Sequence, residues 1–434
     1  MEKQKSSNRS KLIKLVLSLV LTMVVAGSFM LGYFTRYWTM PPVMKDLFEV
    51  FDLTNKFYYG TPEATEEDYA NALVREVLDE YCAYYAPDTY QNVTNNEQGK
   101  YQGVGISFLK AETAPIIYNV SGNSPAKKAG LKIGDKVIGG SNAKFGATTF
   151  TDKNDVLHFL DNTAMGETFS LRVTRDGVFE DREFSITVSK YIKTYVEYYD
   201  SENVLTFTSD TPNGTPKKTV LANDGTDTVI PDADTAYIKL VSFEGNAARE
   251  IGEALAFMKE QGRSKLVLDL INNGGGNLNV LADITAYFVR SQNSNPTIAY
   301  ACDKDGVFKH FSSSTLQMQD HLRHTVVLAN KHTASASEVL IGAMRHYQTI
   351  GEAGLVIVKN DNGVAKTYGK GIMQSTYKLS SGGALKLTTA QLYLPDLQTS
   401  IHGKGFVLPT DSLNAVDTNA DALSRALAIL REKG

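Results

Sequence analysis

The sequence predicts an α/β protein whose C-terminal α/β domain is preceded by a mainly-β domain and, at the N-terminus, by one membrane-spanning helix. Three observations support this prediction. Apolar strands alternate with amphipathic helices from Ala236 onward, short β-rich runs alternate with turn signals between residues 101 and 190, and residues 15–34 contain no charge.

Composition excludes several classes of protein. The 434 residues include 44 basic and 48 acidic side chains, a net charge of −4, which argues against a nucleic-acid-binding protein. The two cysteines, Cys82 and Cys302, are too few for a disulfide-stapled scaffold or a Cys-rich zinc module, although one disulfide between them stays open. The seven histidines show no metal-ligand spacing, so we expect no metal site.

The N-terminal apolar run, Leu15–Phe34, is long enough to cross a hydrocarbon core of about 30 Å as a helix. Basic residues precede it at positions 3, 5, 9, 11 and 14, so the positive-inside rule keeps residues 1–14 in the cytoplasm. A cleaved signal peptide is the alternative, because Ala26, Gly27 and Ser28 are small, but the apolar run continues beyond them. We expect residues 1–34 to be a cytoplasmic tail and a single-pass anchor in the cell membrane, with the rest of the chain outside the cytoplasm.

A helical segment follows the anchor, over residues 42–100. Apolar side chains recur at every fourth position from Tyr69 to Tyr81, which predicts a helix over 65–81 with one apolar stripe and Thr65 as its N-cap. We expect this stripe to pack against the rest of the protein.

Residues 101–190 resemble a PDZ domain of the bacterial, permuted type, and the most specific part of the match is SPAKKAGLKIGDKVI, residues 124–138. A PDZ domain adds a peptide as an extra strand and holds its C-terminal carboxylate with backbone amides. The segment that matches the peptide-binding strand consists of Gly103, Val104, Gly105 and Ile106. The polar residues 200–232 predict a solvated loop or insertion.

The C-terminal domain places a serine at a strand-to-helix turn. A buried-type strand, 266–270, runs into the glycine cluster 274–276, and a second strand, 325–329, leads to Ser335 and the helix after it. Free N–H groups at a helix start favour a developing oxyanion. Serine is also a preferred N-cap, so the alternative is that Ser335 and Ser337 only begin a helix.

A lysine flanked by glycines, Lys370, follows 35 positions after Ser335. If the segment is extended, Lys370 and Gln374 lie on the same face, because side chains alternate along a strand. A buried lysine loses its proton more easily and can act as a base. The alternative is an exposed surface lysine.

Six segments of the C-terminal domain occur in one order, and together they resemble the C-terminal processing peptidases, or tail-specific proteases. They are YIKLVSFEGNAAREIGEAL, LVLDLINNGGG, TASASE, YGKGIMQ, LKLTTAQLYLP and IHGKGFVLPTD. The likeness covers roughly residues 45–434 and implies a serine endopeptidase with a Ser–Lys dyad, a PDZ domain and a crotonase- or ClpP-like core.

Carried over position by position, the resemblance implies that Ser335 is the nucleophile, Lys370 the base and Gln374 the residue that orients the lysine. It assigns the oxyanion hole to the backbone N–H groups of Gly276 and Ala336. The sequence departs from the family pattern at Ile271 (arginine in the family), Gly274 (proline), Thr333 (serine) and an apparent insertion over 359–366. These departures affect the expected shape of the substrate cleft and the expected position of Lys370 relative to Ser335.

The resulting expectation is a membrane-anchored serine endopeptidase that binds protein C-termini through a PDZ domain, 101–190, and hydrolyses peptide bonds in a core, 191–434, without a cofactor. A homo-oligomer or an activating partner stays open. One alternative is a non-catalytic PDZ scaffold that binds exported protein C-termini. Another is a crotonase-type enzyme acting on acyl thioesters, against which the export signal and the PDZ segment argue.

Overall fold

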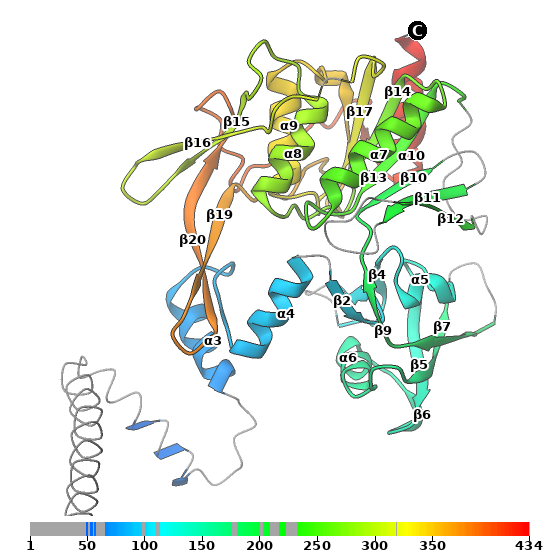
Figure 1. The fold of residues 1–434 in the computed structure, drawn as a ribbon, viewed down its shortest axis with the longest axis vertical. Coiled ribbons are helices and arrows are strands. Elements are labelled where there is room, and N and C mark those ends of the chain that lie inside the picture. The colour runs from blue at the N-terminus through cyan, green and yellow to red at the C-terminus, as the bar shows by residue number, and fades with distance from the viewer. Residues whose placement is uncertain are drawn as a thin grey trace, which may run out of the picture. The chain divides into compact units, whose positions relative to one another are not determined.

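A computed structural model describes most of the chain beyond residue 65 (Figure 1). The described residues are 49–50, 53–54, 56–57, 66–97, 100–108, 113–175, 180–199, 203–208, 217–222, 232–317 and 319–433. The predicted membrane span, Leu15–Phe34, and the predicted N-cap Thr65 lie outside them. Within the described part, no helix is both long enough and apolar enough to cross a membrane. The chain divides into two compact units, residues 1–76 and 77–434.

The helix predicted over 65–81 is α3, Glu66–Val77. Three of the four side chains predicted to pack are exposed, Tyr69 by 39%, Leu73 by 52% and Val77 by 71%, whereas Tyr81, beyond the end of the helix, is half-buried. The periodicity therefore predicted the helix correctly and the burial of its first three stripe residues wrongly, because a spacing of four defines a face without specifying what covers it.

The core of the second unit is an eight-stranded sheet in the order β12, β11, β10, β13, β14, β17, β18, β21. Its strands are β10 (Val196–Tyr199), β11 (Asn203–Thr208), β12 (Lys217–Ala222), β13 (Thr235–Leu240), β14 (Lys265–Asp269), β17 (His324–Ala329), β18 (Leu355–Val358) and β21 (Ala415–Val416). From β13 to β21 neighbouring strands are parallel, whereas β10, β11 and β12 are antiparallel to their neighbours. This confirms the predicted α/β class.

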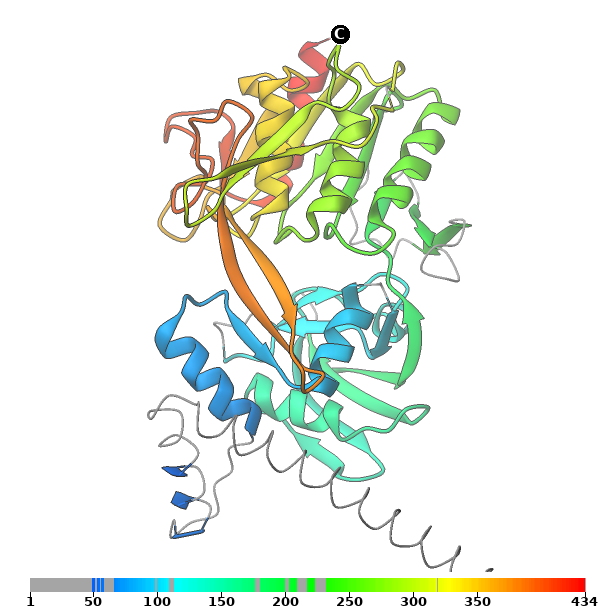
Figure 2. The ribbon, with the colours of Figure 1, turned by 60° about the vertical axis from the view of Figure 1, so that its left-hand side comes forward.

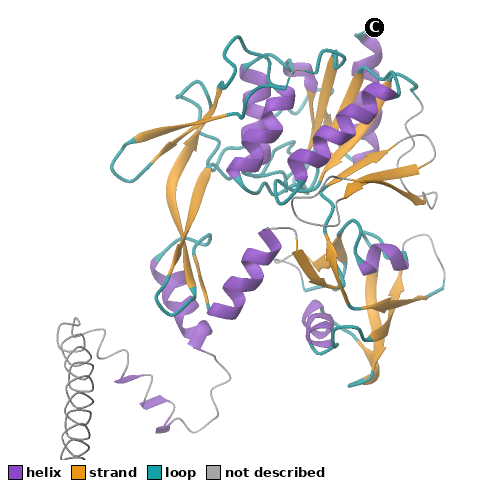
Figure 3. Cartoon of the chain, in the orientation of Figure 1, coloured by secondary structure: helices purple, strands orange, loops and turns teal. Residues whose placement is uncertain are grey.

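Helices cover both faces of this sheet (Figure 3). They are α7 (Ala247–Glu260), α8 (Leu278–Phe288) and α9 (Ala336–His346) on one face and α10 (Asn419–Glu432) on the other. Leu266 and Leu268 of β14 pack in the cluster of the first face, and Val267 between them packs against α10. A strand buried on both faces needs apolar residues at every position, which explains the continuous apolar run.

The polar segment 200–232 differs from its prediction as a solvated loop. Its described parts, β11 and β12, form an antiparallel pair that extends the sheet beyond β10, and Val204, Leu205 and Phe207 are buried. The Thr-, Asp- and Asn-rich composition of the whole stretch masked two short apolar runs inside it.

A second sheet contains β1 (Ala83–Tyr85), β15 (Thr297–Cys302), β16 (Phe308–Ser312), β19 (Ile372–Lys378) and β20 (Ala384–Tyr393). Figure 2 shows β19 and β20 as a long two-stranded ribbon in orange. Because β1 pairs with β20, chain on both sides of the β-rich domain belongs to the same sheet, and that domain is an insertion. Cys82 and Cys302 are free thiols.

The inserted β-rich domain follows α4 (Pro87–Glu97). Its elements are β2 (Lys100–Gly103), β3 (Ile106–Phe108), β4 (Ile117–Val120), α5 (Pro125–Ala129), β5 (Lys136–Asn142), β6 (Gly146–Thr149), α6 (Lys153–Asp161), β7 (Thr168–Thr174), β8 (Arg182–Thr187) and β9 (Ser189–Ile192). The short helix α5 ends at Gly130, which has φ 96°, and Ser124 caps its start by accepting the Lys127 amide.

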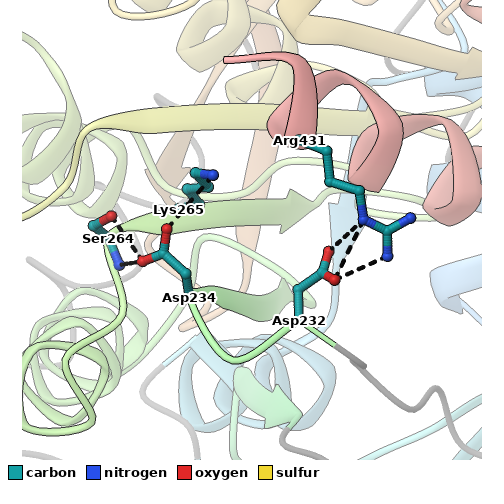
Figure 4. A network of polar contacts seen from close by, with 5 residues as sticks. All are labelled: Asp232, Asp234, Ser264, Lys265 and Arg431. Carbon is teal, nitrogen blue, oxygen red and sulfur yellow. Dashed lines mark hydrogen bonds and ion pairs between the residues drawn. The ribbon is translucent and has the colours of Figure 1, made fainter. Parts of the chain in front are cut away.

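Polar contacts join the residues before β13 to the C-terminal helix and to the start of β14 (Figure 4). Arg431 of α10 forms an ion pair with Asp232 at 2.9 Å, and Lys265 at the start of β14 forms one with Asp234 at 3.5 Å. Ser264 donates from both its backbone and its hydroxyl to Asp234.

The single-turn helix η1 (Glu352–Gly354) leads into β18.

Candidate active site

Ser335 stands at the turn between β17 and α9, where the sequence predicted it. It is the N-cap residue of α9, but its backbone has φ 57° and ψ −119°, whereas an ordinary N-cap is extended. A positive φ is uncommon for a residue other than glycine, and such strain concentrates at functional sites. Helix initiation alone therefore does not account for Ser335.

Ser337 has a structural role instead. Its side chain is fully buried, and its hydroxyl donates to the Asn273 carbonyl at 3.0 Å. The same carbonyl accepts the Ala334 amide at 3.0 Å. The hydroxyl of Ser337 thus joins the start of α9 to the glycine cluster after β14.

Asn273 fixes the shape of that glycine cluster. Its buried side chain donates to the Leu240 carbonyl at 2.7 Å and accepts the Gly275 amide at 2.9 Å. A Cβ atom added to Gly275 would lie 2.8 Å from Ala334 O, Ala336 N and Ser335 Cβ. The glycine cluster is therefore in direct contact with the turn that carries Ser335.

The two amides predicted to bind an oxyanion remain unengaged. Neither the Ala336 nor the Gly276 N–H donates to an acceptor among the described residues. The Gly275 amide is already committed to Asn273, so Gly276 carries the free donor of this loop. Unpaired amides beside a serine at a helix start are the arrangement that an oxyanion hole requires.

Lys370 lies close to Ser335 through its backbone. The amides of both residues donate to Oε2 of Glu338, each at 2.9 Å, so the two nitrogens cannot be farther apart than twice that distance. The Lys370 ammonium lies 4.9 Å from the centre of the Tyr81 ring. Among the described residues no hydrogen bond joins Ser335 Oγ to Lys370 Nζ.

The surroundings of Lys370 favour its neutral form. Burial and then the positive charge of Lys386 lower its pKa, whereas Asp79 and Glu80 act in the opposite direction. The surface-lysine alternative does not fit this half-buried position. A lysine with a lowered pKa is what general-base chemistry needs near neutral pH.

Gln374 is connected to the surroundings of Lys370 only through other residues. A register irregularity between Met373 and Gln374 interrupts the alternation of side chains on which the prediction of a shared face relied. The side-chain amide of Gln374 donates to Thr388 Oγ1 at 3.5 Å, and the backbone amide of Thr388 donates to Cys82 Sγ at 3.4 Å. Gln374 is therefore linked through Thr388 to Cys82, next to Tyr81, and forms no hydrogen bond to Lys370 in the described part.

The sequence analysis missed Glu338 and Tyr81. Glu338 had a signal, because Ser335-x-x-Glu338 has the spacing of a capping box, in which the acidic side chain reaches back to the N-cap amide. No local signal identified Tyr81, because the residues it contacts, Tyr368 and Lys370, lie far away in the sequence. Tyr81 and Tyr368 are 287 positions apart.

Three of the four departures from the family pattern are buried or make contacts of their own. Ile271 and Thr333 are buried, and the Thr333 hydroxyl donates to the Leu270 carbonyl at 2.8 Å. In the apparent insertion 359–366, Lys359 pairs with Asp417 at 3.0 Å and Lys366 donates to the Gly403 carbonyl at 3.2 Å. Both lysines are thus engaged away from Ser335. Within the described ranges, no group of three His, Cys, Asp or Glu side chains is arranged to hold a metal ion.

The segment 103–106 of the β-rich domain presents a strand edge. Gly103 and Gly105 have positive φ, 134° and 87°. Among the strands that the structure describes, β3, which begins at Ile106, pairs with β4 alone. The amides of Val104 and Gly105 donate to no described acceptor. Free amides beside an open strand edge are what strand addition of a peptide requires.

Comparisons with known proteins agree with this arrangement. Residues 234–410 match peptidase family S41, and residues 103–188 match the PDZ domain. A carboxyl-terminal-processing protease of Synechocystis sp. is 27% identical over 362 residues, covering 82% of this chain and 73% of the relative. A probable CtpA-like serine protease of Staphylococcus haemolyticus is 25% identical over 393 residues, covering 87% and 69%. The structure of a putative S41 protease from Bacteroides fragilis shares the fold, with a TM-score of 0.51 at 16% identity over 88% of this chain and 97% of that one.

The fold and the serine turn, together with these matches, define a serine-type peptidase that carries a PDZ domain. The match to peptidase family S41 covers residues 234–410 and the PDZ match covers residues 103–188, and similar proteins include carboxyl-terminal-processing proteases.

Proposed function

We propose that this chain is a membrane-anchored endopeptidase that cleaves polypeptides by a Ser335–Lys370 dyad after its PDZ domain has bound their C-termini. The observation that carries the proposal is the strained turn at Ser335, with φ 57°, which begins α9 and contacts the glycine cluster, and the Gly276 and Ala336 amides donate to no described acceptor. A strained strand-to-helix turn of this kind exposes the nucleophile of many serine hydrolases.

The reaction begins when Ser335 Oγ attacks the scissile carbonyl. Neutral Lys370 accepts the hydroxyl proton and later gives it to the leaving amine. The amides of Gly276 and Ala336 hold the tetrahedral oxyanion, and water then hydrolyses the acyl-enzyme on Ser335. Because Lys370 Nζ lies against Tyr81 in this structure, the first step requires a rotation of the lysine side chain toward Ser335. Catalytic hydrogen bonds commonly form only once substrate is bound.

Two serine variants test the dyad on an unstructured peptide with a free C-terminus, with cleavage followed by mass spectrometry. Ser335→Ala should lose cleavage and keep its fold, since only a hydroxyl is removed. Ser337→Ala is the matched control on the same helix and should keep most activity. A dead Ser337 variant beside an active Ser335 variant would reverse the assignment of the nucleophile.

The base is tested separately. Lys370→Arg should be inactive, because arginine stays protonated at every working pH. The wild-type rate should rise with pH through one ionisation below the ordinary lysine value of about 10.4. An active arginine variant, or a rate that does not change from mildly acidic to alkaline pH, would exclude Lys370 as the base.

The PDZ segment is proposed to hold the substrate C-terminus at the edge of β3. A peptide with a free terminal carboxylate should bind better than the same peptide with a C-terminal amide, because the unpaired amides of Val104 and Gly105 recognise the negative charge. Equal affinity of the two peptides, measured by calorimetry, would remove this role from the segment 103–106.

Membrane anchoring rests on the sequence of residues 1–34 alone. Protease added to intact protoplasts should digest the catalytic domain if residues 1–14 are cytoplasmic. Protection of residues 45–434 would reverse the orientation, and release of the enzyme into the medium would indicate a cleaved signal peptide.

A non-catalytic scaffold is the second candidate function, and the observation that favours it is that no Ser335–Lys370 hydrogen bond occurs among the described residues. In that case the PDZ domain would bind peptides while wild-type protein and Ser335→Ala gave the same, negligible cleavage. The peptide assay above therefore separates the two functions.

A further inference from the structure

The carboxylate of Glu338, on the first turn of α9, is fully buried and receives four hydrogen bonds. Its Oε2 accepts the amides of Ser335 and Lys370, each at 2.9 Å. Its Oε1 accepts the Gly369 amide at 2.8 Å and the Thr367 hydroxyl at 2.6 Å. One side chain thus contacts the turn that carries the serine and the segment that carries the lysine.

The lysine segment is held from its other side as well. The Gly369 carbonyl accepts the Gly403 amide at 2.8 Å, and the Thr367 hydroxyl accepts the Phe406 amide at 2.7 Å. Residues 367–370 therefore lie between the 403–406 loop and Glu338, and Glu338 supplies their hydrogen bonds to α9.

We propose that Glu338 is a positioning residue that sets the distance between Ser335 and Lys370. This inference rests on the proposed dyad and adds the group that brings its two members together. Because one oxygen accepts both amides, a displacement of either residue strains the hydrogen bond of the other. The carboxylate touches neither substrate nor reacting atoms, so its effect is exerted through the two backbones.

A carboxylate is the side chain that this role requires. The four donors need four acceptor lone pairs, which two carboxylate oxygens provide and a carboxamide does not. Burial raises the pKa of Glu338, and the four donors oppose that rise by stabilising the charged form. In the variant Glu338→Gln, the carboxamide would point its own N–H bonds at two of the donors, and at least one of the two segments would have to move away.

Glu250 on α7 is a matched control. It is also a fully buried glutamate, and it accepts the Thr194 hydroxyl at 2.9 Å and the amides of Tyr195 and Val196 at 2.7 and 3.0 Å. All three donors use the same oxygen, Oε2, so a glutamine that places its carbonyl oxygen there turns its NH₂ group toward none of them.

The experiment compares Glu338→Gln, Glu250→Gln and Ser335→Ala in the full-length protein, with kcat and KM measured on a fluorogenic peptide. Glu338→Gln should lower kcat by about 10²-fold with KM changed less than about threefold, because displacement of catalytic groups by about 1 Å costs that much. Labelling of Ser335 by a fluorophosphonate should slow in parallel. Glu250→Gln should keep kcat within about threefold of the wild-type value, a range that a change of less than about 1 kcal/mol allows.

A second variant covers the case in which Glu338→Gln does not fold. Thr367→Val removes one donor to Glu338 and leaves the other three, and it should lower kcat by about tenfold at unchanged KM, the equivalent of about one hydrogen bond. A kcat for either the Glu338 or the Thr367 variant that equals that of Glu250→Gln would overturn the inference, as would a change confined to KM. If Ser335→Ala itself remains active, the proposed dyad fails, which is a different outcome from failure of the Glu338 inference.

Discussion

The contact between the glycine cluster and the serine turn makes a sharp prediction for Gly275→Ala. The backbone of Gly275 has φ 97°, a conformation that costs an alanine about 1–2 kcal/mol. The new Cβ would also lie 2.8 Å from Ala334 O, Ala336 N and Ser335 Cβ, closer than carbon approaches such atoms. None of these three atoms is the end of a flexible side chain, so either the serine turn or the glycine cluster has to shift.

Such a shift moves the two amides proposed to bind the oxyanion relative to Ser335. Loss of one oxyanion donor costs about 10²–10³-fold in kcat, so we expect Gly275→Ala to lower kcat by at least about 10²-fold. The stability cost should be about 1–3 kcal/mol, in line with one strained backbone position. The assay is steady-state cleavage of a peptide, with thermal unfolding recorded on the same samples.

Gly274→Ala is the control one position earlier. A Cβ there meets nothing within 4 Å, and φ is not in the left-handed region. We expect Gly274→Ala to keep kcat within about threefold of the wild-type value. If the two alanine variants had the same kcat, or if Gly275→Ala retained full activity, the reasoning from this contact would be refuted.

Ser337→Ala loses a buried hydrogen bond to Asn273 and should cost about 1 kcal/mol of unfolding free energy in chemical denaturation, whereas no change would mean that the bond contributes nothing. Lys386→Gln removes a positive charge that lowers the pKa of Lys370, so the acidic limb of the rate profile should move to higher pH, and a shift to lower pH would contradict this. Burial raises the pKa of Glu250 to about 8, above an unfolded value of about 4.3, so the folded protein binds a proton that the unfolded chain releases. The wild-type unfolding free energy should therefore fall as the pH rises from about 5 to 8, and Glu250→Gln should flatten that dependence; equal slopes would refute it.

The sequence predicted the parts of the site that depend on local order along the chain. Ser335 at the start of a helix and the glycine cluster after a buried strand follow from strand-turn-helix patterns, whereas the amides of Gly276 and Ala336 were assigned by the family resemblance. These features need only a few neighbouring residues, so a single sequence contains them.

What the sequence did not predict depends on pairing between distant segments. Tyr81 meets the Lys370 ammonium because β1 pairs with β20, and no local pattern encodes that pairing. The irregularity at Met373 changes the direction of Gln374, and bulges leave no signal in an alternation of residue types. The apolar stripe of α3 shows the same limit, because the residues that cover a helix face are specified elsewhere.

The positive φ of Ser335 limits which nucleophile this turn can carry. Two hydrogen bonds of the Ser335 backbone hold the turn: its amide donates to the Glu338 carboxylate, and its carbonyl accepts the Val339 amide at 3.0 Å. A β-branched side chain is a genuine outlier at φ near 57°, so threonine would keep the hydroxyl and lose the turn. Cysteine has no such branch. The backbone of this turn therefore accommodates a serine hydroxyl or a cysteine thiol, each carried on an unbranched Cβ atom, and excludes threonine.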